Sequence, residues 1–167
     1  ETAVFTIFVA AYVYYLGKSQ SGPTPAQVLD LPIVVSLLLW SSSVTIHVAV
    51  RALGRGRVAA FTRWWFLTIL LGALFLGGTG TEWHRLIYRD GLTIWTNLFG
   101  TTFYALVGLH ASHVIVGLLL LTIVGLLALR GHVHAAHAGR AETLSLYWHF
   151  VDAVWVVVFL VVYVVGR

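Results

Sequence analysis

The chain has 167 residues, of which 59% are hydrophobic and only 10% are charged. A soluble domain of this size has no core that could bury so many apolar side chains, so the composition predicts an integral membrane protein. Ten Lys and Arg against six Asp and Glu give a formal net charge of +4, and the chain has no cysteine. The basic residues lie in short connections between apolar runs, which favours anionic lipid headgroups over nucleic acid as their partners.

The apolar runs predict five helices, which lie in chain order at about residues 1–16, 31–50, 64–83, 98–129 and 144–165. A membrane helix needs roughly 20 apolar residues to cross about 30 Å of hydrocarbon, and the second, third and fifth runs fit that length. The fourth run would be about 48 Å long at about 1.5 Å per residue, so it must tilt or protrude. The first run is short and starts without methionine, so we expect further residues upstream of Glu1 in the gene product. The predicted fold class is all-α, a polytopic membrane bundle with five transmembrane helices forming one domain over residues 1–167.

The connections between these runs predict the orientation of the chain. Residues 17–30 contain glycine and two prolines, residues 51–63 are basic, and residues 130–142 are rich in histidine. The second and fourth connections together carry six Arg, against four Lys and Arg on the opposite side. By the positive-inside rule these two connections are cytoplasmic and the C-terminus is outside.

Ionisable residues inside apolar runs need a partner or access to water, because each costs at least about 2.5–3.5 kcal/mol at a helix centre on insertion scales. His47 lies one turn from Arg51, and Glu82 is beside Trp83 and His84. We therefore expect His47 and Glu82 to reach the membrane interface.

Two histidines lie near the middle of the fourth run. His110 and His113 are spaced i, i+3 and so share one helix face, with glycines at positions 100, 108 and 117 nearby. Small residues let helices approach closely, so we expect the two imidazoles to make polar contacts between helices. The alternative is haem or metal ligation, with His113 and His149 as the ligands on two helices, although their expected depths in the membrane differ.

The connection before the last helix holds His132, His134 and His137. Three close histidines are compatible with zinc or copper, but there is no fourth ligand and no cysteine. We expect a solvated loop.

The last run begins with LYWHFVDAVW, in which His149 and Asp152 are spaced i, i+3, while Trp148, Asp152 and Trp155 follow a second stripe. A histidine and an aspartate on one face can share a proton or a hydrogen bond, and tryptophan N–H groups can add donors. From the residues alone this group could be a proton relay, a lipid-headgroup site or a structural contact between helices.

Two of these segments carry a resemblance. FYALVGLHASHVIVGLLLL (103–121) and LSLYWHFVDAVWVVVFLVVYVVG (144–166) resemble the last two helices of subunit III of the haem-copper terminal oxidases. The matched pattern is an aromatic pair, Gly-x-His-x-x-His-Val and Gly, followed by aromatic-Trp-His-Phe-x-Asp-x-Val-Trp. At the start of the chain, ETAVF is similar to the family's Ser-Glu-x-x-x-Phe helix start, which places Glu1 on its buried glutamate.

This resemblance implies a subunit without an active site, haem or metal of its own, belonging to a proton-pumping oxygen reductase of an aerobic electron transport chain. Its partners would be the catalytic subunit I, which holds the haems and copper, other oxidase subunits and bound structural phospholipid. It would stabilise subunit I and support proton uptake into it. The complex would lie in a bacterial plasma membrane or a mitochondrial inner membrane. The implied buried polar and motif residues are Glu1, Glu82, His110, His113, Trp148, His149, Asp152 and Trp155.

Three other functions stay open at this point. An accessory protein of a nitric oxide reductase shares the same helices and motifs, so only the partner complex would distinguish it. A membrane haem protein that carries electrons would use His113 and His149. A proton-coupled transporter would be expected to show internal repeats, and the sequence has none.

Overall fold

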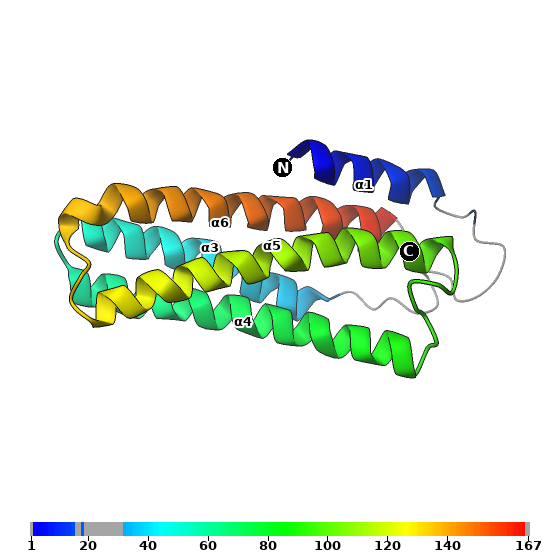
Figure 1. Ribbon diagram of the computed structural model, residues 1–167, viewed down its shortest axis with the longest axis horizontal. Helices are drawn as coiled ribbons and strands as arrows, with labels where there is room; N and C mark the ends of the chain where they lie inside the picture. Colours follow the sequence, from blue (N-terminus) through cyan, green and yellow to red (C-terminus); the bar gives the residue numbers. More distant parts are fainter. Residues whose placement is uncertain (1, 16–17, 19–31, 166–167) are drawn as a thin grey trace. The chain divides into compact units, whose positions relative to one another are not determined.

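The computed structural model describes residues 2–15, 18 and 32–165, and every regular element within those ranges is helical. Figure 1 traces them in chain order. They are α1 (Thr2–Tyr15), α3 (Ile33–Gly54), α4 (Val58–Tyr88), α5 (Leu98–Leu129), the 3-10 turn η1 (Ala135–His137), α6 (Ala138–Phe159) and the π-helical turn η2 (Leu160–Val165).

Four helical stretches of the described chain are long and apolar enough to cross a membrane. They are α3, α4, α5 and the continuous stretch Ala135–Val165, which contains α6. Helix α1 is apolar but shorter. The prediction of an all-helical membrane protein is therefore confirmed, while a fifth crossing made by the first helix stays a prediction.

Two helices, α4 and α6, begin before the apolar runs that predict them, and α4 also ends after its run. Helix α4 begins at Val58 and ends at Tyr88, whereas its apolar run covers 64–83. Helix α6 begins at Ala138, ahead of the predicted position 144. Hydropathy measures how much of a helix lies in hydrocarbon, whereas backbone hydrogen bonds can continue beyond it into the polar interface.

Helix ends follow from local sequence. Gly56 and Gly131 adopt positive φ angles of 73° and 74°, which glycine reaches without steric cost. After α5, the N–H of His132 donates to the carbonyl of Leu127 and that of Gly131 to Ala128, which is the Schellman pattern that ends a helix. At the other end of α5, the Asn97 side chain accepts the N–H of Gly100 at 2.8 Å and so caps the first turn.

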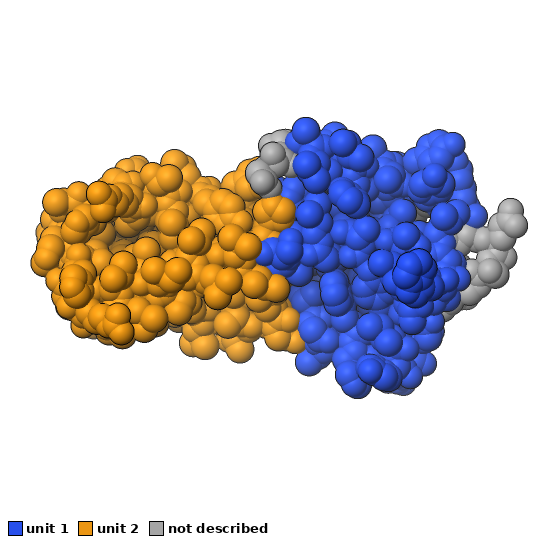
Figure 2. All heavy atoms as spheres, in the orientation of Figure 1, with its two compact units in different colours: residues 1–32, 79–112, 153–167 blue, residues 33–78, 113–152 orange. Residues whose placement is uncertain are grey.

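The described chain divides into two compact units, coloured orange and blue in Figure 2. Unit 2 comprises residues 33–78 and 113–152, and unit 1 comprises residues 1–32, 79–112 and 153–167. Helices α4, α5 and α6 each contribute residues to both units. Each unit is described by itself below.

Unit 2 contains segments of four helices, and each is tied to the next by a polar contact. Thr45 on α3 meets Thr68 on α4 at 2.7 Å between hydroxyl oxygens. Trp65 on α4 donates to the Leu121 carbonyl on α5 at 2.8 Å. The ring of contacts is closed by Tyr147 and Trp148 of α6, which reach α5 and α3 respectively. These contacts fix the four segments as a bundle around a core of buried aromatic side chains.

Unit 1 is held mainly by aromatic pairs. Tyr12 on α1 packs edge-on against Phe99 on α5, with ring centroids 6.4 Å apart. Trp83 on α4 packs in the same way against Tyr104 on α5, at 5.2 Å. Such pairs add about 0.5–1.5 kcal/mol each beyond the area that they bury. Helix α1 also contacts the turn η2 at the end of α6.

Candidate functional site

A buried carboxylate in unit 2 is the centre of the candidate site. Asp152 on α6 is 5% exposed. The Ser43 hydroxyl, on α3, donates to its Oδ2 atom and lies 3.0 Å from Nδ1 of His149. On the other side of that imidazole, Ser145 Oγ lies 3.3 Å from Nε2. We call Ser43, Ser145, His149 and Asp152 the Asp152 cluster.

The hydrogen bonds of this cluster have a defined direction. A serine hydroxyl carries one proton, and Ser43 gives its proton to the Asp152 carboxylate. Ser43 therefore accepts the proton on Nδ1 of His149. In the neutral imidazole Nε2 is then the acceptor, and it takes the Ser145 hydroxyl proton. The donors thus run in one direction, from Ser145 through His149 and Ser43 to the carboxylate.

An exposed imidazole lies next to the cluster. The ring of His47 on α3 is 6.5 Å from that of His149 between centroids, and the His47 side chain is exposed. Within the described part of the chain, Oδ1 of Asp152 is buried and has no hydrogen-bond partner. The arrangement therefore places an exposed imidazole beside a hydrogen-bonded cluster whose buried carboxylate still has an unused acceptor atom.

Trp148 fixes the position of this part of α6. Its side chain is fully buried, and its Nε1 donates to Ser42 Oγ on α3 at 2.8 Å. The indole fits because two neighbouring helices have glycine against it. A Cβ atom at Gly117 would lie 2.8 Å from the ring, and one at Gly72 would lie 2.9 Å from it. This close packing holds α6 in the rotation that brings Asp152 to Ser43, the residue after Ser42.

A second polar contact lies in unit 1. The Tyr163 hydroxyl in η2 donates to the Glu82 carboxylate on α4, at 3.2 and 3.3 Å from its two oxygens. Trp155 stacks on His110, with centroids 4.9 Å apart and an angle of 28° between the rings. Both His110 and Trp155 are buried. The structure therefore places three of the predicted motif residues in contacts between helices of this unit.

The remaining predicted residues have other surroundings. The His113 backbone carbonyl accepts a hydrogen bond from Tyr147 at 3.1 Å, which joins α5 to α6.

In the connection before α6, His132 and His134 are exposed and His137 is half-buried. Across the described ranges, no group of three or more His, Cys, Asp or Glu is arranged to hold a metal ion. Glu1 lies outside the described residues.

The alternative of haem ligation requires a histidine whose ring nitrogen can bind the iron. An axial histidine ligand must offer a ring nitrogen to the iron. Both ring nitrogens of His149 lie within hydrogen-bond distance of serine hydroxyls. His149 in this arrangement therefore does not fit the role of a haem ligand.

Sequence reasoning missed the serines and the tyrosine of these contacts. Ser43 belongs to the run SSS at positions 41–43, an unusual polar triplet in an apolar helix, and that run was an available signal. It does not reveal which hydroxyl faces another helix. Ser41 bonds to the Leu37 carbonyl of its own helix, whereas Ser42 and Ser43 reach α6.

Comparison with known proteins decides the family. A family model described as cytochrome c oxidase subunit III matches residues 4–167. The chain belongs to the cytochrome c oxidase subunit III family. The Asp152 cluster and the Tyr163–Glu82 contact both lie within the matched range, and Glu1 lies just before it.

Curated relatives of the subunit III family match nearly the whole chain. A protein of Alkalihalophilus pseudofirmus is 35% identical over 99% of this chain and 82% of its own length. One of Bacillus sp. (strain PS3) is 37% identical over 99% of this chain and 81% of its own length. One of Synechocystis sp. is 38% identical over 98% of this chain and 70% of its own length. Each is named cytochrome c oxidase subunit 3.

Proposed function

We propose that this chain is a core subunit III of a proton-pumping haem-copper oxygen reductase and has no active site of its own. The observation that carries the proposal is the subunit III family match over residues 4–167. Relatives at 35–38% identity carry the name cytochrome c oxidase subunit 3, which favours an oxygen reductase over a nitric oxide reductase. The partner that holds the haems and copper is then the catalytic subunit I.

Support of proton uptake is the role that we assign to the Asp152 cluster. Its donors run toward one buried carboxylate, and the exposed His47 lies beside His149. Chains of hydrogen bonds of this kind can pass protons, because each hydroxyl or imidazole accepts a proton on one side and releases one on the other. Ser145 lies in the half of α6 that the positive-inside rule assigns to the cytoplasm, and His149 and Asp152 follow near the middle of the helix.

Structural phospholipid is the second part of the proposal. A cavity of about 160 Å³ in unit 1 lies between α1 and α6. Its lining is almost entirely apolar and consists of Phe5, Thr6, Val9, Val154, Val157 and Val158. The pocket opens to the surface of the helices and its lining is apolar, so it suits a segment of a lipid acyl chain.

The proposed topology follows the sequence prediction. The chain forms one membrane domain with five crossings and an outward C-terminus, in a bacterial plasma membrane or a mitochondrial inner membrane. The four long apolar stretches and the shorter α1 support this number of crossings. Six arginines lie in the α3–α4 and α5–α6 connections or near the helix ends beside them, against four Lys and Arg on the opposite side, and this excess supports the orientation.

Asp152→Asn in the assembled oxidase tests the role of the cluster. The amide keeps the shape of the side chain but cannot carry the negative charge that accepts a proton. We expect lower turnover or a shorter active lifetime during continuous turnover, with the haem spectrum unchanged. Glu142→Gln is the matched control, because it removes an exposed carboxylate from the same helix. Turnover and lifetime equal to those of the control would refute the proton-support role.

A further inference from the structure

Tyr163 differs from two other tyrosines of the described helices in the group that accepts its hydrogen bond. The hydroxyls of Tyr104 and Tyr147 donate to backbone carbonyls, at 2.8 and 3.1 Å. The Tyr163 hydroxyl instead donates to the Glu82 carboxylate, at 3.2 and 3.3 Å from its two oxygens. A backbone carbonyl accepts a hydrogen bond but does not keep a proton near neutral pH, whereas a carboxylate can do both. Tyr163 therefore has a proton acceptor within reach.

Aromatic rings connect this buried phenol to half-buried side chains of unit 1. The Tyr163 side chain is 1% exposed, and its ring centroid lies 6.4 Å from that of Phe103. The centroid of Phe103 lies 5.2 Å from that of Tyr104, and the centroid of Tyr104 lies 5.2 Å from that of Trp83. Tyr104 and Trp83 are half-buried. These four rings, which we call the aromatic path, thus run from a buried phenol to side chains that solutes in the membrane can approach.

The Tyr163–Glu82 pair has the chemistry of an oxidisable tyrosine. Removal of one electron from a phenol makes its O–H group strongly acidic, so the oxidised ring persists only if a base takes the proton. Proton transfer needs a donor and an acceptor within hydrogen-bond reach, and the contact between Tyr163 and Glu82 provides both. Burial of Tyr163 also keeps its radical from coupling with a second phenol.

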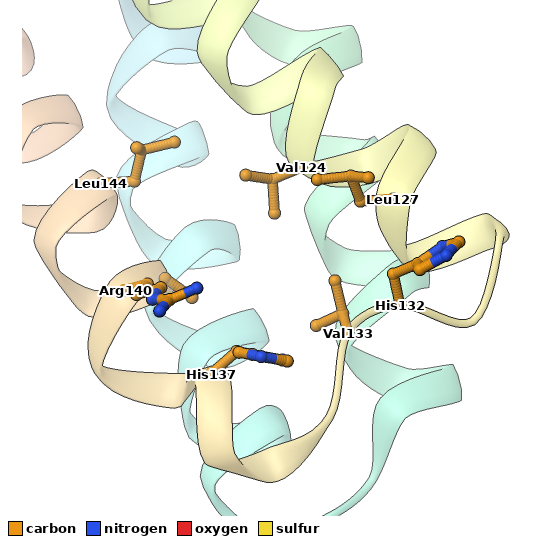
Figure 3. Close-up of a pocket in the computed structure, with 8 residues that line it drawn as sticks. Val124, Leu127, His132, Val133, His137, Arg140 and Leu144 are labelled. Carbon is orange, nitrogen blue, oxygen red and sulfur yellow. The ribbon is translucent and has the colours of Figure 1, made fainter.

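A pocket in unit 2 shows the contrast. It lies between the end of α5 and the start of α6, and its polar lining consists of His132, His137 and Arg140 (Figure 3). The other residues that line it are aliphatic. The basic groups of this pocket hold positive charge or exchange protons, but none of them gives up an electron readily. The pocket therefore has proton-binding groups without an oxidisable ring, whereas the Tyr163–Glu82 pair combines the two.

We propose that the Tyr163–Glu82 pair donates an electron to oxidants of the alkoxyl-radical class, which form when lipid hydroperoxides are split, and so converts them to alcohols. The alkoxyl radical takes an electron from Trp83 and a proton from water, which leaves an alcohol and hydroxide. Tyr163 replaces the electron through the aromatic path, its O–H bond breaks, and the proton moves to Glu82. A reductant of the thiol or quinol class then returns one electron to the tyrosyl radical, and the proton comes back from Glu82.

The pair at rest is an ordinary phenol and carboxylate, so the chain holds no resident redox centre. Its contacts lie within unit 1 and involve no partner subunit. The proposal therefore does not depend on membership of an oxidase complex.

Electron paramagnetic resonance of the purified complex that contains this chain tests the proposal. Photo-oxidised ruthenium tris(bipyridine), with persulfate as the electron acceptor, supplies a one-electron oxidant in place of the alkoxyl radical. Exposed tyrosines such as Tyr88 react as well, so the sample is frozen after the radicals open to solvent have decayed. We expect a persistent tyrosyl signal that is lost in Tyr163→Phe. The signal should be kept in Tyr147→Phe, the matched control, because the Tyr147 hydroxyl donates to a carbonyl.

Two further variants test the proton acceptor and the aromatic path. The amide in Glu82→Gln still accepts a hydrogen bond but does not take up a proton, so the persistent signal should be lost there too. Trp83→Leu interrupts the aromatic path and should lower the yield of the persistent signal. In the unchanged protein, the infrared difference spectrum between the oxidised and resting states should gain the carbonyl band of a newly protonated carboxylic acid. This measurement needs no variant, so it decides the matter where a replacement destabilises the complex.

Three results would overturn the proposal. They are equal persistent signals in Tyr163→Phe and Tyr147→Phe, an undiminished signal in Glu82→Gln or Trp83→Leu, and an infrared difference spectrum of the unchanged protein without the carboxylic acid band. Because these experiments measure a radical and a proton rather than turnover, they can fail while the proposed oxidase role stands.

Discussion

Replacing Ser43 with alanine removes the one hydroxyl that joins α3 to both members of the predicted His–Asp pair. The hydroxyl donates to Asp152 Oδ2 and accepts from His149, so its loss leaves two polar groups without that partner. A hydrogen bond to a charged group contributes about 1.5–3 kcal/mol in soluble proteins. Polar contacts between membrane helices contribute less, on average about 0.6 and at most about 1.7 kcal/mol. Because one hydroxyl serves two partners here, we expect a loss of about 1–2 kcal/mol.

Ser41→Ala is the matched control for this prediction. Ser41 is exposed, lies on the same helix and bonds only within it, to the Leu37 carbonyl at 2.7 Å. Its replacement should change the free energy of unfolding by less than about 0.5 kcal/mol. Unfolding of both variants is followed by circular dichroism in the same mild detergent. Equal stability of Ser43→Ala and Ser41→Ala would refute the assigned contact.

The coupling between Ser43 and Asp152 can be measured separately. Removing both partners of a buried polar contact costs less than removing one, because no unsatisfied group is left behind. Ser43→Ala should therefore cost less in an Asp152→Leu background than in the unchanged protein. Additive losses in the double variant would contradict a direct interaction.

Two further predictions concern packing, one in each unit. Gly72→Ala should destabilise the chain by about 1–3 kcal/mol, because a Cβ atom there would lie 2.9 Å from its nearest neighbours. Gly77→Ala on the same helix should be tolerated, because a Cβ atom there would have nothing within 4 Å. Tyr163→Phe should cost about 0.6–1.7 kcal/mol through loss of the bond to Glu82. Tyr88 is 77% exposed, so Tyr88→Phe should be neutral. Thermal unfolding checks both pairs, and equal midpoints within either pair would contradict the packing described for that unit.

Helix type and approximate position could be predicted from the sequence, because apolar runs of membrane length have few alternatives to a helix. The run at 98–129 matches α5 at both ends. The run at 64–83 does not reveal that α4 continues to Tyr88, because residues near the interface can stay helical without being apolar. Hydropathy therefore predicts the segment that crosses the membrane better than it predicts where the helix begins and ends.

The candidate site could be predicted only along one helix at a time. The i, i+3 spacing correctly places His149 and Asp152 on one face of α6, but the link between them runs through Ser43 of α3. In the same way, His110 of α5 stacks on Trp155 of α6, and the spacing within α5 does not reveal this partner. Spacing within a helix defines a face, whereas the partner of that face depends on how helices rotate and pack, which a single sequence does not encode in a readable pattern.

Purification of the tagged chain from its native membrane in mild detergent tests the central claim, that this chain is an oxidase subunit without a redox centre of its own. The account predicts that a haem- and copper-containing catalytic subunit co-purifies, and that the haem absorption stays with that subunit after this chain is dissociated. A haem band that travels with the isolated chain, or a purified complex without a haem-copper subunit, would contradict the account.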